Sequence, residues 1–131
     1  MKILVFGSNG LVGQSLRRNL VIDKKNNCFF STRKDTDLFS FEQTQKIITE
    51  FNPDLIVNAA AKVGGIHANN NYGSSFLIEN LKININILES IIPFPNIKLI
   101  NLGSSCIYPL NAKNPIKEEY FMTGKLEPTN S

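Results

Sequence analysis

The chain has 131 residues and a formal net charge of +3 at pH 7, and 42% of its residues are hydrophobic and 19% charged. This length allows one domain with a real core, and the composition is that of an ordinary soluble globular protein. Basic residues are scattered among acids, without a basic stripe interleaved with aromatic side chains, which argues against a nucleic-acid partner. No apolar stretch approaches membrane-spanning length, and the first apolar run is too short for a signal peptide.

The two cysteines, Cys28 and Cys106, are too far apart in the sequence for a metal knuckle or a CxxC redox pair. The sequence therefore predicts no metal site. Two isolated thiols and the absence of a recognisable leader favour a reducing compartment, so we expect a cytoplasmic protein that does not bind a membrane.

The strongest pattern lies at the N-terminus, where a short apolar run leads into a glycine-rich turn and then into a helix. Lys2–Phe6 (KILVF) suits a strand buried on both faces, and apolar residues recur at helical spacing from Leu11 to Leu20. Between them, residues 7–13 read GSNGLVG. This order predicts a site for the diphosphate of a dinucleotide, because a helix N-terminus offers unpaired N–H groups and a positive dipole end. The predicted contacts are Gly7, Asn9, Gly10, Leu11, Val12 and Gly13.

Each glycine has a predicted task in this turn. Gly7 allows the tight turn, Gly10 lets the backbone approach the diphosphate, and Gly13 lets the helix pack closely on the strand. The alternative interpretation is a glycine-rich turn between a strand and a helix that binds nothing.

Residues 28–32 (CFFST) predict a second strand, and the end of this strand meets the adenosine ribose in a dinucleotide-binding fold. An acid at this point would hold the free 2′-hydroxyl of NAD, but Arg33 and Lys34 come first and Asp35 follows them. A guanidinium pairs well with a dianionic 2′-phosphate, so Arg33 favours NADP as the cofactor. The alternative, a solvated surface side chain, applies more to Lys34 than to Arg33.

Residues 54–61 (DLIVNAAA) predict a third buried strand that ends in small side chains. Those of Ala59, Ala60 and Ala61 would let a cofactor pass close to the backbone. A loop is expected at 62–67. There we interpret the only histidine, His67, as a structural residue, and Lys62 as either a phosphate contact or a solvated side chain.

Two further helices are predicted. One begins at a capping box formed by Ser40 and Gln43 and ends at Asn52-Pro53. The other covers residues 72–92 and carries two apolar stripes on nearly opposite sides. The stripes are Leu77, Leu81, Ile85, Leu88 and Ile92 on one side, and Ile83, Ile87 and Ile91 on the other. One stripe can cover the sheet, so the other needs a missing helix, another subunit, or both.

A fourth strand is predicted at 98–102 (KLINL), with GSSCIYP at its carboxyl end, and residues 110–131 read as mostly surface loop. The fold class is therefore α/β: a Rossmann-like parallel sheet with helices on both faces, in strand order 3-2-1-4. The outer edge of the fourth strand would be unpaired, so we expect the isolated chain to be poorly soluble or dimeric.

Four segments together give the chain a resemblance to the GDP-L-fucose synthases, a family of extended short-chain dehydrogenases. They are GSNGLVG at 7–13, AAKVGGIHANN at 60–70, GSSCIYP at 103–109 and LEPTN at 126–130. The first segment is generic to a superfamily, whereas the second and third together are narrow. The resemblance covers essentially the whole chain. It implies NADP(H), a homodimer, and two reactions on GDP-4-keto-6-deoxy-mannose, namely epimerisation at C3 and C5 and then hydride delivery to the C4 ketone.

Carried over residue by residue, the resemblance implies that Ser104 hydrogen-bonds the 4-oxygen of the substrate and that Cys106 is the acid/base of epimerisation. A hydroxyl donor stabilises developing negative charge, and a thiol with a pKa of about 8.5 can exchange protons with carbons beside a ketone. The alternative for Cys106 is a small buried hydrophobic residue. Arg33 matches the arginine near the 2′-phosphate, while Asn9 stands where relatives carry another basic residue, which weakens the preference for NADP.

The family pattern continues into a Tyr-x-x-x-Lys motif that these 131 residues do not contain. In the family this tyrosine protonates the 4-oxygen, so we expect the chain to be an N-terminal fragment that is inactive alone. The Rossmann domain in 1–131 would be incomplete, lacking the later strands and the substrate domain. Its expected partner is a second copy of the chain or a complementing C-terminal half.

Two other functions remain open from the sequence. One is another nucleotide-sugar epimerase or dehydratase, although Ser105-Cys106-Ile107 does not fit the Thr-Asp-Glu typical of 4,6-dehydratases. The other is a dinucleotide-binding module without catalysis. Binding of NADP(H) without turnover fits both a fragment and a module, whereas turnover by this chain alone would contradict the need for the Tyr-Lys pair.

Overall fold

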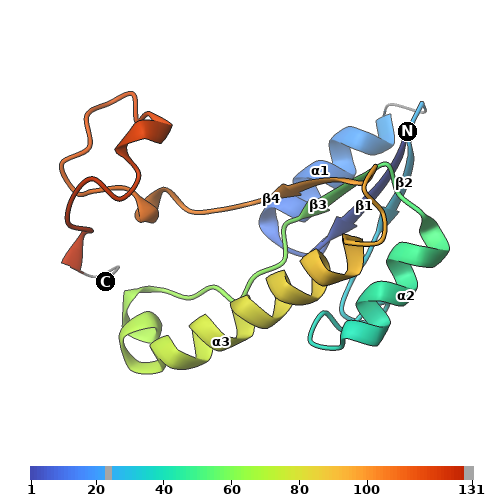
Figure 1. Ribbon diagram of the computed structural model, residues 1–131, viewed down its shortest axis with the longest axis horizontal. Helices are drawn as coiled ribbons and strands as arrows, with labels where there is room; N and C mark the ends of the chain where they lie inside the picture. The colour runs from blue at the N-terminus through green and yellow to red at the C-terminus, as the bar shows by residue number, and fades with distance from the viewer. Residues whose placement is uncertain (23–24, 129–131) are drawn as a thin grey trace.

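A computed structural model describes residues 1–22 and 25–128, so Thr129 and Asn130 of the 126–130 motif lie outside the described residues. Within these residues the chain forms four strands, three α-helices and two short 3-10 turns (Figure 1). The strands are β1 (Lys2–Phe6), β2 (Asn27–Phe30), β3 (Leu55–Asn58) and β4 (Lys98–Asn101). The helices are α1 (Leu11–Ile22), α2 (Phe41–Phe51) and α3 (Ile66–Ile91), and the turns are η1 (Ser105–Ile107) and η2 (Glu118–Tyr120).

The strands form one parallel sheet in the order β2-β1-β3-β4. The predicted order 3-2-1-4 is therefore wrong, while the α/β fold class and the parallel sheet are confirmed. The difference follows from burial. Three of the four residues of β3 are buried, whereas no residue of β2 is, so β3 takes a central position beside β1 and β2 an edge. The chain leaves β1 for β2 on one side and returns over α2 to β3 on the other, which makes the β1–β3 boundary a topological switch point.

Alternate residues of β1 pack against helices on opposite faces of the sheet. Ile3 and Val5 contact a cluster that includes Leu16 and Leu20 of α1. Leu4 and Phe6 contact the larger cluster with Ile48 of α2 and with Ile83 and Ile87 of α3. Helices on both faces, as predicted, follow from this period of two.

Helix α2 is closed at both ends by local interactions. The Ser40 hydroxyl accepts a hydrogen bond from the N–H of Gln43 at 3.2 Å, which confirms the predicted N-cap. The Gln43 side chain accepts from the N–H of Asp37 at 3.0 Å instead of completing the capping box. At the C-terminus, Asn52 adopts a left-handed conformation with φ 46°, and its N–H donates to the carbonyl of Ile48.

Helix α3 begins six residues earlier than the sequence predicted, so Ile66 and His67 belong to the helix rather than to the loop. Tyr72, where the predicted helix began, has non-helical angles (φ −129°, ψ 25°) and marks a kink. The two apolar stripes differ in burial. Ile83 and Ile87 are 5% and 1% exposed against the sheet. The other stripe remains largely exposed: Leu77, Leu81, Ile85, Leu88 and Ile92.

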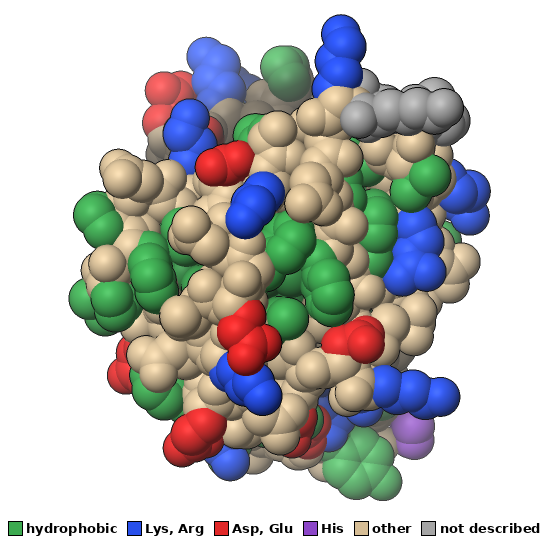
Figure 2. Space-filling view, turned by 90° about the vertical axis from the view of Figure 1, so that its right-hand side faces the viewer, with side chains coloured by type: hydrophobic (Ala, Val, Ile, Leu, Met, Phe, Trp, Pro, Cys, Tyr) green, Lys and Arg blue, Asp and Glu red, His purple; other side chains and the backbone are tan. Residues whose placement is uncertain are grey.

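Beyond β4 the chain runs away from the sheet, and residues 103–128 form a separate lobe of loops and 3-10 turns (Figure 1). Within the described residues no strand pairs with the outer edge of β4. Acidic and basic side chains are interspersed on the face shown in Figure 2. In the described part of the chain, no helix combines the length and apolar character that crossing a membrane requires.

The burial difference on α3 gives a matched test of the fold. Ile87→Ala should lower the free energy of unfolding by about 2–5 kcal/mol, because it leaves a cavity in the larger core cluster. Ile85→Ala, on the exposed stripe at 47% exposure, should change it by less than about 0.5 kcal/mol. Urea unfolding followed by circular dichroism measures both. Equal losses for the two variants would contradict this assignment of faces.

Candidate functional site

The glycine-rich turn after β1 depends on close backbone packing. Gly7 has φ 73°, and a Cβ atom there would lie 2.6 Å from the backbone of Ala59 at the end of β3. A Cβ atom on Gly13 would lie 2.3 Å from the carbonyl oxygen of Gly7, so no side chain fits where α1 meets the turn. The N–H of Gly10 donates to the carbonyl of Gly7 at 3.0 Å. The turn therefore brings the N-terminus of α1 to the carboxyl ends of β1 and β3.

Ser8 connects this turn to the segment that follows β2. Its side chain is almost fully buried, and its hydroxyl donates to the carbonyl of Ser31 at 2.8 Å. The N–H of Ser31 donates in turn to the carbonyl of Val5 at 2.9 Å. The sequence analysis did not identify Ser8, and its only signal was a small polar residue directly after Gly7.

Residues 32–36 form a tight turn closed by a carboxylate. Asp35 accepts hydrogen bonds from the hydroxyl of Thr32 at 2.7 Å and from its N–H at 2.8 Å. These bonds hold the pKa of Asp35 below its ordinary value of 3.8, and the bond from the Thr32 hydroxyl has the largest effect. The positive charges of Arg17 and Lys34 lower this pKa by smaller amounts. The first acid after β2 is therefore engaged within its own turn, and Arg33 and Lys34 stand at the surface of that turn.

A pocket of about 370 Å³ lies over the β1–β3 switch point. Its lining comes from the glycine turn, from the segment after β2, from the end of β3 and from α3. The lining residues are Phe6, Gly7, Ser8, Asn9, Gly10, Ser31, Thr32, Arg33, Lys34, Thr36, Asp37, Leu38, Phe39, Ala59, Ala60, Ala61 and Ile83. In open α/β sheets, ligands bind in the crevice outside the carboxyl ends of the strands at such a point.

Seven of the residues predicted to bind the cofactor line this pocket: Gly7, Asn9, Gly10, Arg33, Ala59, Ala60 and Ala61. Leu11, Val12 and Gly13 do not line it but form the first turn of α1. The apolar wall of Leu38, Phe39 and Ile83 was missed, because residues 37–39 read only as the approach to a helix. The side chain of Asn86 on α3 holds this wall by donating to the carbonyl of Leu38 at 2.8 Å.

The pocket has the chemistry that a phosphorylated dinucleotide requires. Leu38, Phe39 and Ile83 provide an apolar wall, and Arg33 and Lys34 add two cations. The first-turn N–H groups of α1 have no partners within the helix and face an anion favourably. Thr36 lines the pocket as well, and among the described residues its buried hydroxyl is the one buried side-chain group without a hydrogen-bond partner.

The structure places Ser104 and Cys106 apart from this pocket, at the start of η1 beyond β4. The Ser104 hydroxyl accepts from the N–H of Cys106 at 3.2 Å, and a hydroxyl in this role keeps its own proton to donate. Both side chains are exposed, so the alternative of a buried hydrophobic residue does not hold for Cys106. The amide of Asn58 ties the ends of β3 and β4 together by donating to the side chain of Asn101 at 2.7 Å.

Lys62 and His67 differ in how they are held. His67 is exposed in the first turns of α3, where its carbonyl accepts from the Asn71 side chain at 2.9 Å. Lys62 is half-buried and forms an ion pair with Glu79 of α3. The structure thus supports neither a solvated lysine nor a lysine directed at a ligand.

A sequence profile of the NAD dependent epimerase/dehydratase family matches residues 3–131. The chain belongs to this family. The match includes every residue that lines the pocket, and it agrees with the parallel sheet and its switch point.

Individual relatives are similar over nearly the whole chain. GDP-L-fucose synthase 1 of Arabidopsis thaliana is 42% identical over 98% of this chain, which covers 40% of that protein. A GDP-L-fucose synthetase from Naegleria fowleri, solved with NADP, is 31% identical over 96% of the chain and 38% of its own, with a TM-score of 0.82. A GDP-mannoheptose C4 reductase from Campylobacter jejuni, solved with NADP, is 36% identical. The match covers 98% of this chain and 40% of the reductase, with a TM-score of 0.85. The chain thus spans about two-fifths of the length of these relatives.

The Thr32–Asp35 turn gives a prediction about pH. Thr32→Val removes the hydroxyl that lowers the pKa of Asp35 most, so this pKa should rise toward 3.8. A depressed carboxyl pKa stabilises the fold above pH 3.8, and the stabilisation is lost as the pH falls through the folded-state value. Stability should therefore fall less steeply in acid for Thr32→Val. Carboxyl-carbon NMR titration measures the pKa, and Thr49→Val on the exposed side of α2 is the control. A wild-type Asp35 that titrates at 3.8 or higher would contradict the bonding described.

Proposed function

We propose that the chain binds NADP(H) in the pocket over the β1–β3 switch point and is the cofactor-binding portion of a GDP-L-fucose synthase. The whole enzyme would epimerise GDP-4-keto-6-deoxy-mannose at C3 and C5 and reduce its C4 ketone. The observation that carries the proposal is the glycine turn, in which Gly7 packs against Ala59 and leaves the N-terminus of α1 facing a pocket bordered by Arg33.

Each part of the pocket has a role toward the cofactor. The backbone of Gly10 and the N–H groups of Leu11, Val12 and Gly13 would hold the diphosphate at the helix N-terminus. Arg33 would pair with the 2′-phosphate, and the small side chains of residues 59–61 would let the cofactor lie close to the end of β3. NADP is favoured over NAD because the carboxylate of Asp35, the first acid after β2, is already bonded to Thr32.

The names of the three relatives described above support a GDP-sugar as substrate. The relatives with 31–42% identity are named as GDP-fucose synthases or as a GDP-heptose reductase. The Ser104 hydroxyl would donate a hydrogen bond to the 4-oxygen, where negative charge develops, and Cys106 would pass protons to and from the carbons beside the ketone. NADPH would supply the hydride to C4. An exposed thiol with this role needs a reducing compartment such as the cytoplasm.

Two exposed features support a partner polypeptide. The exposed stripe of α3, with Leu81 and Ile85 at 49% and 47% exposure, and the outer edge of β4 are apolar or unpaired within the described residues. We propose that a complementing C-terminal half or a second copy of the chain covers them. Because the 131 residues contain no Tyr-x-x-x-Lys, we also propose that this chain alone binds the cofactor without completing the reaction.

Arg33 gives the test of cofactor choice. Arg33→Met should weaken NADP binding about 10- to 100-fold, as expected for a lost charge-assisted hydrogen bond, and change NAD binding less than about threefold. Isothermal titration measures both, with Lys46→Met on the exposed side of α2 as the control, because Lys46 does not line the pocket. In wild type, the amide resonances of residues 7–13 should shift on adding NADP. Unmoved resonances would overturn the proposed site.

Complementation tests the partner proposal. The chain alone should show no ketone reduction, whereas mixing it with the part of the Arabidopsis relative that it does not cover should restore turnover. Replacing Leu81 and Ile85 together by glutamate should abolish this rescue while leaving NADP affinity unchanged, because both side chains lie on the exposed stripe. Thr49→Glu on α2 is the control. Turnover by the unmixed chain would contradict the proposal.

A further inference from the structure

In the loop that follows β3, Lys62 makes a set of hydrogen bonds to α3. The N–H of Lys62 donates to the Asn80 side-chain oxygen at 2.7 Å, and the Asn80 amide donates to the Lys62 carbonyl at 2.9 Å. Its ammonium donates to the hydroxyl of Ser75 at 2.9 Å and pairs with Glu79. Its nitrogen also lies 5.2 Å from the centre of the Phe76 ring. Both backbone and side chain of Lys62 are thus fixed by one stretch of α3.

The partner of that ammonium, Glu79, stands beside the pocket. It lies one helical turn before Ile83 on the same face of α3, and Ile83 lines the pocket. Hydrogen bonds from Lys62 and Ser75 hold the pKa of Glu79 below its ordinary value, and the charge of Arg33 adds a smaller effect in the same direction. Arg33 and Ile83 line the same pocket, so Arg33 borders the space beside the stretch of α3 that carries Glu79.

An unpaired carboxylate at this position would disturb a phosphate site in two ways. It would attract the Arg33 guanidinium toward α3, and it would repel a dianionic phosphate bound by Arg33. The ion pair with Lys62 cancels that charge locally. The Ser75 hydroxyl, which donates to the same carboxylate oxygen at 2.8 Å, holds the carboxylate in this position.

We infer that Lys62 is a positioning residue that neutralises Glu79 and so leaves Arg33 available for the 2′-phosphate of the dinucleotide. The inference rests on the proposed binding of NADP and adds a determinant that does not touch the cofactor. Its signature is selective, because NAD lacks the 2′-phosphate that Arg33 would bind and should respond less to the charge at Glu79. A purely structural role in holding the loop would affect both dinucleotides equally.

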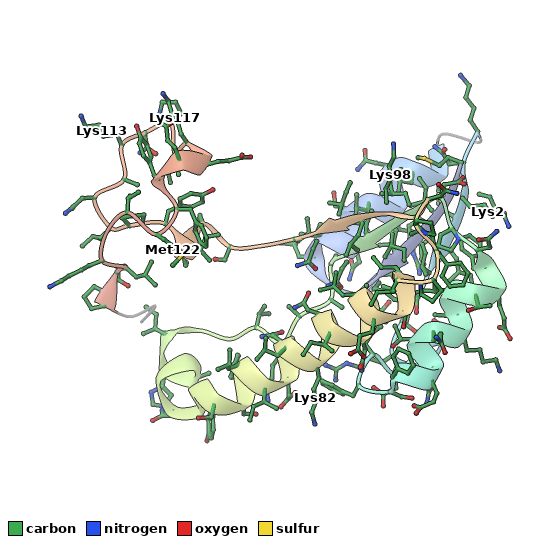
Figure 3. The ribbon with its side chains drawn as sticks, viewed as in Figure 1. Lys2, Lys82, Lys98, Lys113, Lys117 and Met122 are labelled. Atoms are coloured by element: carbon green, nitrogen blue, oxygen red, sulfur yellow. The ribbon has the colours of Figure 1, made fainter. Side chains whose placement is uncertain are left out.

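The test compares dissociation constants of NADP and NAD, measured by isothermal titration on the whole chain. Lys62→Met should reduce the preference for NADP over NAD about 3- to 30-fold, the range expected for one uncompensated charge near a partly solvated site. Adding Glu79→Gln to Lys62→Met should restore the wild-type preference. Raising the salt concentration should shrink the effect of the single variant. Lys82→Met is the matched control, because Lys82 points away from the sheet on the same helix (Figure 3).

The outcomes separate this inference from the proposed function. Wild type that binds neither dinucleotide, or shows no preference for NADP, overturns the proposed function. Wild type that prefers NADP while Lys62→Met loses both dinucleotides equally, or is not rescued by Glu79→Gln, overturns the role of Lys62. If Lys62→Met fails to fold, the same two dissociation constants are measured for the single variant Glu79→Gln, and they decide the role of Lys62. It should keep or increase the NADP preference, and a decrease would overturn the inference.

Discussion

At the carboxyl ends of the two central strands, the backbone of Gly7 lies so close to the backbone of Ala59 that no side chain fits between them. The same constraint operates where Gly13 meets the carbonyl of Gly7. These two contacts bring β1, β3 and the N-terminus of α1 to one point, and the pocket opens there. Its walls depend on the same packing, because Ser8 ties the turn to the segment after β2. The site is thus a consequence of close backbone approach in the core.

The sequence predicted the parts of the site that depend on local chemistry. Glycine spacing identified the turn, the small residues at 59–61 identified the end of β3, and the Ser40 cap identified the start of α2. The strand order was not predicted correctly, because lateral position depends on how burial compares between strands. The apolar wall of Leu38 and Phe39 was also missed, since it depends on α3, which holds residue 38 from far along the chain. A contact between residues far apart in the sequence leaves no local sequence pattern from which it could be predicted.

Electrostatics around the pocket follow one rule: nearby acids are engaged by local donors, and the cations remain. Asp35 is bonded to Thr32, and Asp37 accepts from the N–H of Phe39 at 3.0 Å. Glu79 is held by Lys62 and Ser75. Arg33 and Lys34 line the pocket on the same side. These hydrogen bonds orient Asp35 and Asp37 without removing their negative charge, so Arg33 and Lys34 are the groups of the pocket lining that can pair with an anion.

The carboxylate that closes the turn at residues 32–36 has a consequence for engineering coenzyme choice. The backbone that carries Arg33 takes its shape from the bonds between Thr32 and Asp35. A redesign for the unphosphorylated coenzyme cannot simply recruit Asp35 to the ribose, because turning its carboxylate away would break both of its hydrogen bonds to Thr32. A new acid would have to be introduced at another position while this loop is kept intact. Specificity and local architecture are coupled here, so reversing one requires preserving the other.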